Sequence, residues 1–280
     1  MKLIYNIFEL EQYILFLKKR KKNIGFVPTM GALHKGHISL AAKARAENDV
    51  CVCSIFVNPG QFNNAEDFKN YPRSLNSDIE LFEQSGTDAV FIPSEEEIYP
   101  EPVKEKFDLG GLDKIMEGRF RPGHFNGVAF IVKKLFNLIK PDRAYFGEKD
   151  FQQLAIIKYM VKKLAMPIKI ITCPTIREND GLAMSSRNKR LSAEERMKAP
   201  LIYETLLEAK EKIKKQSVAE VKKWVEMQIN SCDLIMMEYF EVADSETLTL
   251  ADAIDKNKHY NACIAVYVGN IRLIDNIKIL

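Results

Sequence analysis

Apolar and polar positions follow two different patterns along the 280 residues of the chain. Between residues 23 and 176, short runs rich in Val, Ile and Phe recur between segments whose apolar residues are spaced as on one face of a helix. The short runs are NIGFVP, DVCVCSIFVNP, DAVFIP, RAYFG and IKIITCP, and a polar or glycine-containing turn follows each of them. This alternation predicts an α/β fold, a Rossmann-like and mostly parallel sheet with crossover helices.

The pattern changes beyond Ser192, where long charged segments with helical spacing precede strands of alternating apolar and polar residues. The helical segments are 193–216 and 218–229, and the strands are expected within 239–244 and 263–277. Such a succession predicts a smaller α+β domain. We therefore expect a Rossmann-like domain over residues 1–175 and a smaller α+β C-terminal domain over residues 176–280.

The charge balance gives no reason to expect a nucleic-acid or membrane partner. The chain has 41 Lys and Arg against 38 Asp and Glu, a net charge of +3. The KKRKK run at residues 18–22 is best interpreted as the solvated C-terminal end of the first helix, where cations suit the helix dipole.

The cellular compartment follows from the N-terminal pattern and the cysteines. Glu9 and Glu11 interrupt the apolar run that a signal peptide requires, and no later segment approaches membrane-spanning length. Five cysteines without a CxxC pair argue against both a disulfide framework and a zinc site. We expect a cytoplasmic protein with buried, reduced thiols.

The first candidate functional segment is GFVPTMGALHKGH, Gly25 to His37. It connects an expected strand to a helix expected over 37–48. Ligands in such sheets bind at the carboxyl ends of strands, so the loops after Val27, Val57 and Phe146 are candidate sites. The helix N-terminus presents free N–H groups to an anion, and His34 can add an imidazole donor beside His37. In the alternative interpretation, the glycines only form a tight turn and the histidines are surface residues.

Two further segments are suited to phosphate. In GEKD, Gly147 to Asp150, Lys149 precedes a helix expected over 150–164 and faces its dipole unfavourably unless an anion is present, while Asp150 can bind a ribose or cap the helix. In MSSRN, residues 184–188, Ser185 and Ser186 offer two hydroxyls and Arg187 offers a guanidinium group, all suited to phosphate oxygens. The alternative for these serines is a helix N-cap, which Ser192 can supply without them.

The order T-x-G-x-x-H-x-G-H resembles the HIGH-type nucleotidyl-transferase superfamily, and MSSRN stands where that superfamily has a mobile KMSKS-like loop. Seven blocks are similar in order and spacing to the pantothenate synthetase (pantoate–β-alanine ligase) family. They are FVPTMGALHKGH, SIFVNPGQF, YPRSLNSD, RPGHFNGV, FGEKDFQQL, PTIRENDGLAMSSRN and YVGNIRLIDN. The resemblance covers essentially the whole chain.

This resemblance implies an ATP-dependent ligase of pantothenate and coenzyme A biosynthesis. It would adenylate pantoate with ATP and Mg²⁺, pass the pantoyl group to β-alanine, and release AMP and pyrophosphate. The resemblance also implies a homodimer, and a C-terminal domain that acts as a lid and carries the MSSR loop. The alternatives are an adenylyl transferase acting on a phosphorylated acceptor, a tRNA-binding fragment of a synthetase, and a purely structural protein.

The resemblance also assigns residues to the reaction. The catalytic residues would be His34, His37, Lys149 and Arg187, with His37 in the position of the general acid. The ATP-binding residues would be Met30, Gly31, Ala32, Leu33, His34, Lys35, Gly36, His37, Gly147, Glu148, Lys149, Asp150, Ile176, Met184, Ser185, Ser186 and Arg187. Pantoate would contact Gln61, Gln153, Met30, Phe146 and Val132, and Gln61 would also contact β-alanine.

The YPRSLNSD block departs from the family pattern, which tends to carry consecutive acidic residues. Here Ser77 precedes Asp78. If a carboxylate of this block binds Mg²⁺, only Asp78 can do so, and the metal would otherwise be bound mainly by phosphates and water.

Overall fold

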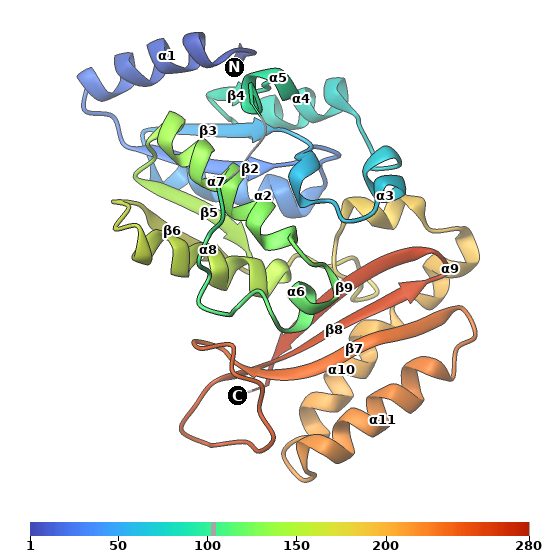
Figure 1. The fold of residues 1–280 in the computed structure, drawn as a ribbon. Coiled ribbons are helices and arrows are strands. Elements are labelled where there is room, and N and C mark those ends of the chain that lie inside the picture. The colour runs from blue at the N-terminus through green and yellow to red at the C-terminus, as the bar shows by residue number, and fades with distance from the viewer. Residues whose placement is uncertain (102–104, 280) are drawn as a thin grey trace. The chain divides into compact units, whose positions relative to one another are not determined.

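The computed structural model describes residues 1–101 and 105–279, and the chain divides into two compact units (Figure 1). The first unit comprises Met1–Glu148 and Ile156–Pro174, and the second comprises Lys149–Ala155 and Thr175–Leu280. The segment Lys149–Ala155 therefore belongs with the C-terminal part of the chain, although it lies before residue 175 in the sequence.

The first unit is built on a six-stranded parallel sheet with the strand order β1-β4-β3-β2-β5-β6. Its strands are β1 (Lys2–Ile4), β2 (Ile24–Thr29), β3 (Val50–Ile55), β4 (Ala89–Phe91), β5 (Arg143–Gly147) and β6 (Lys169–Cys173). The five strands predicted from apolar runs are confirmed, whereas β1 was not predicted from the sequence. The chain extends from β2 toward β3 and later continues on the other side, at β5, so the strand order reverses beside β2.

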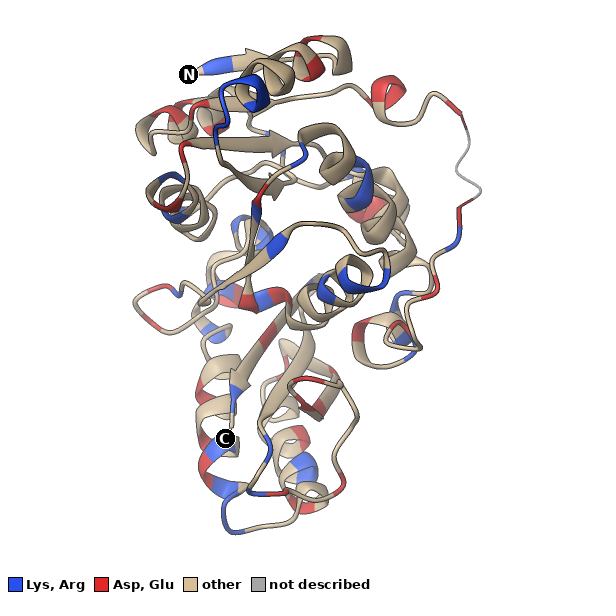
Figure 2. Cartoon of the chain, turned by 90° about the vertical axis from the view of Figure 1, so that its left-hand side faces the viewer, with Lys and Arg blue, Asp and Glu red and all other residues tan. Residues whose placement is uncertain are grey.

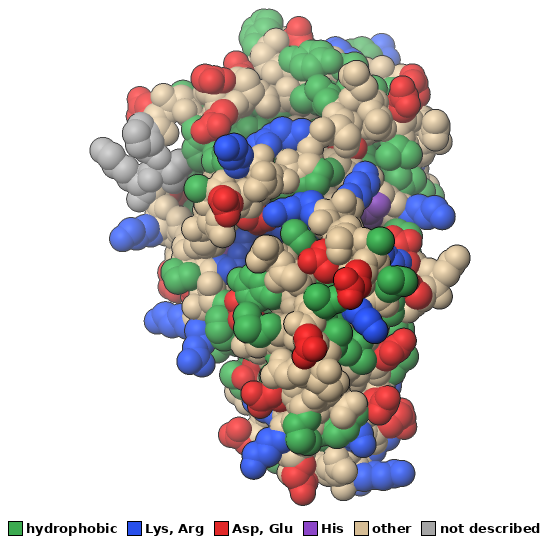
Figure 3. Space-filling view, turned by 90° about the vertical axis from the view of Figure 1, so that its right-hand side faces the viewer, with side chains coloured by type: hydrophobic (Ala, Val, Ile, Leu, Met, Phe, Trp, Pro, Cys, Tyr) green, Lys and Arg blue, Asp and Glu red, His purple; other side chains and the backbone are tan. Residues whose placement is uncertain are grey.

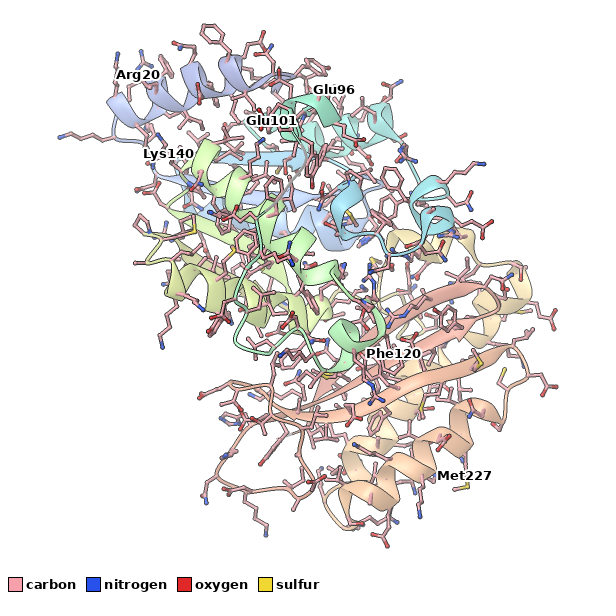
Figure 4. All side chains as sticks on the ribbon, in the orientation of Figure 1. Arg20, Glu96, Glu101, Phe120, Lys140 and Met227 are labelled. Atoms are coloured by element: carbon pink, nitrogen blue, oxygen red, sulfur yellow. The ribbon has the colours of Figure 1, made fainter. Side chains whose placement is uncertain are left out.

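Helices cover both faces of this sheet. On one face, Ala41 and Ala44 of α2 and Phe82 of α4 share a buried core with Val27 and Cys53 of the strands. On the other face, Phe136 of α7 packs edge-on against Phe26 of β2. The helices in this part of the chain are α1 (Ile7–Lys19), α2 (Lys35–Glu47), α3 (Ala65–Lys69), α4 (Leu75–Gln84), α5 (Glu95–Ile98), α6 (Met116–Phe120), α7 (His124–Ile139) and α8 (Phe151–Lys163), with 3-10 turns η1 (Pro59–Gln61) and η2 (Glu148–Asp150). Lys140, labelled in Figure 4, ends α7 in a left-handed conformation.

The second unit is a three-stranded antiparallel sheet with helices packed on it, the α+β arrangement expected from the sequence. Its strands are β7 (Ile235–Asp244), β8 (Tyr260–Val268) and β9 (Ile271–Lys278), and its helical segments are η3 (Ser186–Arg190), α9 (Ala193–Lys198), α10 (Leu201–Lys212) and α11 (Val218–Asn230). Val221 and Val225 of α11 and Leu206 of α10 are buried in the core with the strands. The labelled Met227 of α11 is 63% exposed on the opposite face of that helix (Figure 4).

Two segments that read as continuous in the sequence are interrupted in the structure. The predicted helix over 193–216 is two helices, because Pro200 has no N–H to donate to the preceding turn and instead stands before α10. The predicted strand region 263–277 is two strands joined at Gly269, whose φ of +55° suits a tight turn.

Charged residues of both signs are interspersed along both units (Figure 2), and the face shown in Figure 3 mixes basic, acidic and apolar side chains. In the ranges 1–101 and 105–279, no helix combines the length and apolar character needed to cross a membrane. Cys51, Cys53, Cys173 and Cys263 are buried thiols, and Cys232 is partly exposed.

Candidate active site

The loop that follows β2 carries the first group of predicted residues. Gly31 and Ala32 both have left-handed backbones, with φ of +78° and +50°, and a side chain at Gly31 would also approach Asp78 to 2.9 Å. The left-handed conformation costs free energy at an alanine, so other contacts must hold it. The carboxylate of Asp78 supplies them, because it accepts the backbone N–H of Ala32 at 2.8 Å and that of Leu33 at 2.7 Å. Asp78 is 2% exposed.

His34 and His37 lie at the start of α2 and share one hydrogen-bonding arrangement. His34 is the N-cap, and its Nδ1 accepts the N–H of Gly36 at 3.1 Å. The Nδ1 of His37 accepts the N–H of His34 at 3.4 Å, and the two rings lie 4.0 Å apart between centroids. An accepting Nδ1 carries no proton, so each neutral ring has its proton on Nε2, where it is a hydrogen-bond donor. The predicted pair of histidines thus provides two hydrogen-bond donors of fixed orientation.

The N-terminus of α2 is an electropositive site. Its first turn contains Lys35 and no acidic residue, so no side chain of that turn neutralises the positive end of the helix dipole. Backbone N–H groups, imidazole donors and an ammonium group in one turn favour a bound anion such as phosphate. The predicted helix start near His37 is close to the observed start at Lys35.

Gln61 and Met30, two predicted substrate residues, are in contact. Gln61 lies in η1 after β3, is 9% exposed, and donates from Nε2 to the Met30 Sδ at 3.0 Å. Its Oε1 accepts from Asn58 Nδ2 at 3.0 Å, and the Asn58 Oδ1 accepts the hydroxyl of Tyr99. The amide of Gln61 is therefore held at the carboxyl end of β3 beside an apolar thioether.

The backbone of Gln61 is held by residues that sequence reasoning did not identify. Its carbonyl accepts from His124 Nδ1 at 2.7 Å and from Arg121 at 3.2 Å. Gly127 of α7 lies against the same turn, since a Cβ there would come within 2.0 Å of the Gly60 carbonyl oxygen. The RPGHFNGV block contains all three residues, so its place among the seven blocks was the available signal.

The other predicted residues of the first unit are placed as follows. Phe146 is 7% exposed at the end of β5 and packs edge-on against Phe136, and Val132 of α7 is 5% exposed. Both belong to the apolar core of the unit. Gly147 follows Phe146, and a Cβ there would meet nothing within 4 Å, so this end of β5 leaves open space for a ligand. Glu148 starts η2.

Lys149 and Asp150 belong to the second unit. The Lys149 side chain is 19% exposed, and its ammonium group lies 3.3 Å from the Asp150 carboxylate. The carbonyl of Lys149 accepts a hydrogen bond from Asn276 Nδ2 at 3.0 Å. Gln153, partly exposed, follows in the first turn of α8.

The segment Ile176 to Arg187 forms a turn closed by its own backbone. The N–H of Met184 donates to the Ile176 carbonyl at 3.0 Å, and Arg177 pairs with Ala183 as an isolated bridge. Ser185 then caps η3, because its hydroxyl accepts the N–H of Arg187 at 3.3 Å.

Ser192, as the sequence allowed, caps α9 with Glu195 in a capping box, so Ser185 and Ser186 are not needed there. Ser186 is 5% exposed in η3.

The predicted metal ligand Asp78 has an arrangement that a cation would not favour. Its two oxygens accept from two backbone N–H groups and from the Ser74 hydroxyl at 3.1 Å, which leaves little capacity for a metal. Within residues 1–101 and 105–279, no group of three or more His, Cys, Asp or Glu side chains is arranged to bind a metal ion. The described side chains thus do not fit a protein-bound Mg²⁺ at this position.

Comparison with known proteins gives one consistent result. The sequence model of the pantoate–β-alanine ligase family matches residues 2–278. A pantothenate synthetase of Phocaeicola vulgatus is 53% identical over 279 residues, and one of Porphyromonas gingivalis is 48% identical over 278 residues, with 99% of each chain covered.

Solved structures agree. The pantothenate synthetase of Thermus thermophilus superimposes with a TM-score of 0.92 at 40% identity, covering 100% of this chain and 99% of that chain. A pantoate–β-alanine ligase of Francisella tularensis, complexed with "Beta-gamma ATP" and β-alanine, gives a TM-score of 0.77 at 37% identity, covering 99% and 97%.

Proposed function

The chain belongs to the pantoate–β-alanine ligase family, and from this premise we propose that it joins pantoate to β-alanine in two steps through a pantoyl adenylate. In the first step a carboxylate oxygen of pantoate attacks the α-phosphorus of ATP, and pyrophosphate leaves. In the second, the neutral amine of β-alanine attacks the activated carbonyl, and AMP leaves. The observation that best supports this function is the pair of oriented Nε2 donors at the N-terminus of α2.

In the first unit, we assign His34 and His37 to the phosphates of ATP, together with the backbone of the loop Met30–Leu33 and the start of α2. Negative charge on the phosphate oxygens develops toward pyrophosphate as the bond to the α-phosphorus breaks. Two fixed donors at a positive helix end stabilise this charge without reorganising. His37 is the general acid in this assignment. Gly147 leaves the end of β5 open to the nucleotide.

In the second unit, we propose that Lys149 and Arg187 stabilise the same negative charge, which develops on the departing pyrophosphate. The Lys149 ammonium group lies beside the Asp150 carboxylate. When ATP binds, its phosphate oxygens would either take the place of this carboxylate as the partner of Lys149 or bind Lys149 together with it. Arg187 offers a guanidinium fork that suits phosphate oxygens. Ser185, Ser186, Met184 and the backbone of Ile176 complete the set assigned to ATP in this unit.

Pantoate is a small, branched hydroxy acid, and the assigned residues match that chemistry. Amides of Gln61 and Gln153 can bind its hydroxyls and carboxylate, while Met30, Phe146 and Val132 offer apolar contacts to its methyl groups. The direct contact of Gln61 with Met30 places an amide next to an apolar group, which supports their joint assignment. Gln61 is also assigned to β-alanine.

Mg²⁺ enters as a companion of ATP and not as a resident of the protein. The carboxylate of Asp78 accepts hydrogen bonds from the backbone N–H groups of Ala32 and Leu33, so Asp78 has a structural role in this proposal and does not bind the metal. ATP and water supply the oxygen ligands that Mg²⁺ prefers.

The second step needs no covalent attachment to the protein, because the mixed anhydride is already activated and the bound reactants need only be held together. We further propose that the enzyme is a cytoplasmic homodimer. Buried thiols such as Cys51 and Cys53 suit a reducing compartment, and the dimer rests on family resemblance alone.

Exchange of labelled pyrophosphate into ATP, with pantoate present and β-alanine absent, tests the proposed adenylate. Exchange that requires pantoate, and is absent with a panel of other carboxylates, is the expected result. Well-folded protein that shows no exchange with pantoate would contradict the two-step proposal.

A further inference from the structure

Asn276, near the end of β9, holds the backbone of Lys149 although 127 positions separate them. Its Nδ2 donates to the Lys149 carbonyl at 3.0 Å, while its Oδ1 accepts from Asn261 Nδ2 at 3.0 Å. Asn276 is 6% exposed. A buried amide group whose nitrogen and oxygen both form hydrogen bonds has little freedom to rotate. It therefore fixes the position of the Lys149 backbone relative to β9.

The neighbouring Asp275 holds a second segment through Arg177. The guanidinium donates to both oxygens of the Asp275 carboxylate, NH1 to Oδ2 at 2.6 Å and NH2 to Oδ1 at 3.0 Å. The side chains are 3% exposed for Asp275 and 17% for Arg177, so this bidentate pair lies away from bulk water. Arg177 also packs over the Tyr203 ring, 3.7 Å from its centroid.

Arg177 ties this ion pair to the turn that carries Ser185 to Arg187. Its NH1 donates to the Gly181 carbonyl at 3.0 Å, inside the turn closed by Ile176 and Met184. Its NH2 donates to the carbonyl of Asn276 at 3.2 Å, on the edge strand of the sheet. One guanidinium thus joins the edge of β9 to the turn, and Asn276 contacts both this group and Lys149.

Resting on the proposed function, we infer that Asp275 and Asn276 are positioning residues for ATP. Asn276 positions the backbone of Lys149. Asp275 acts through Arg177 and positions the turn that precedes Ser185–Arg187. These two residues belong to the YVGNIRLIDN block, which the residue assignments for ATP and pantoate leave without a role. Burial raises the pKa of the Asp275 carboxyl, and the charges of Arg177 and Lys149 act in the opposite direction.

The full-length enzyme with Asn276→Asp and Asp275→Asn tests this inference. Asn276→Asp keeps the shape of the side chain but replaces the donor to Lys149 by an acceptor. Each change is expected to raise the KM for ATP roughly five- to tenfold, the effect of about one hydrogen bond, with the KM for β-alanine changed less than twofold. The matched controls are Asn230→Asp, which accepts a backbone N–H of β7, and Glu238→Gln, whose partner Arg272 lies on β9.

A second measurement separates positioning from general destabilisation. If Asn276 acts through Lys149, the effect of Asn276→Asp on the KM for ATP should disappear in a Lys149→Ala background. An equal effect in both backgrounds, or unchanged ATP kinetics in both single variants, would overturn the inference.

If the Asn276→Asp variant does not fold, Asn276→Ser is measured instead, with Lys149 present and in the Lys149→Ala background. The same outcomes then support or overturn the inference. Pyrophosphate exchange by the unmodified enzyme is measured first, since its absence would refute the proposed function and not the role of Asn276.

Discussion

The carboxylate of Asp78 accepts the backbone N–H of Leu33 at 2.7 Å, across 45 positions of sequence. Together with its bond to Ala32, this contact fixes the loop that leads into the paired histidines. A buried carboxylate bound to N–H groups of a left-handed turn is part of the loop's structure. The same residue was predicted as a metal ligand, so the two roles lead to different experiments.

Asp78→Asn is expected to slow pyrophosphate exchange roughly 10- to 100-fold, because hydrogen bonds to a charged acceptor contribute about 1.5–3 kcal/mol each and an amide retains only one acceptor oxygen. Exchange is measured across a titration of Mg²⁺, with the exposed Glu80→Gln of the same helix as control. If the carboxylate holds the loop, excess Mg²⁺ does not restore the rate. Full recovery at high Mg²⁺ would identify Asp78 as a metal ligand instead.

His37→Ala is expected to slow adenylation roughly 100- to 1000-fold, the usual effect of removing one donor that stabilises the transition state. The substitution also removes the hydrogen bond from the His34 N–H to the His37 Nδ1, and this loss weakens the N-terminus of α2. The melting temperature is therefore recorded alongside the rate. His259→Ala, an exposed histidine before β8, is the control. A folded His37→Ala enzyme with the full adenylation rate would remove His37 from the mechanism.

Local sequence patterns predicted the elements of the fold but not the partners of the site residues. Apolar runs such as DVCVCSIFVNP, which contains β3, predicted buried parallel strands, because a strand covered on both faces is apolar throughout. The glycines and histidines after β2 predicted an anion site, which stays a prediction, because both features lie in one short segment of the chain. These signals need only a short window of sequence.

The roles of Asp78 and Asn276 could not be read in this way. Asp78 contacts residues 45 and 46 positions away, and Asn276 contacts one 127 positions away. Which polar side chain meets which backbone depends on the strand order and on where each loop ends. Nothing in the pattern around Asn276 distinguishes it from any other polar residue at a strand end.

Lys149→Ala is expected to slow the formation of pantoyl adenylate more than the transfer of a pantoyl group from preformed adenylate. The ammonium group is assigned to charge on the departing pyrophosphate, which is absent from the second step. The two half-reactions are measured separately, with Lys158→Ala, an exposed lysine of α8, as control. Equal slowing of both half-reactions would contradict this assignment.

Gly127→Ala tests whether the close approach of α7 to η1 positions Gln61. A methyl group at Gly127 would lie 2.0 Å from the Gly60 carbonyl oxygen and 2.8 Å from the Gln61 nitrogen, and neither backbone atom can turn aside as a side chain can. The turn must move, at a cost of roughly 1–3 kcal/mol of stability. Because Gln61 is assigned to pantoate, the KM for pantoate should rise while the KM for ATP changes little. Asn137→Ala, exposed on the same helix, is the control. A stable Gly127→Ala enzyme with unchanged KM for pantoate would show that Gln61 tolerates the shift, or that pantoate binds elsewhere.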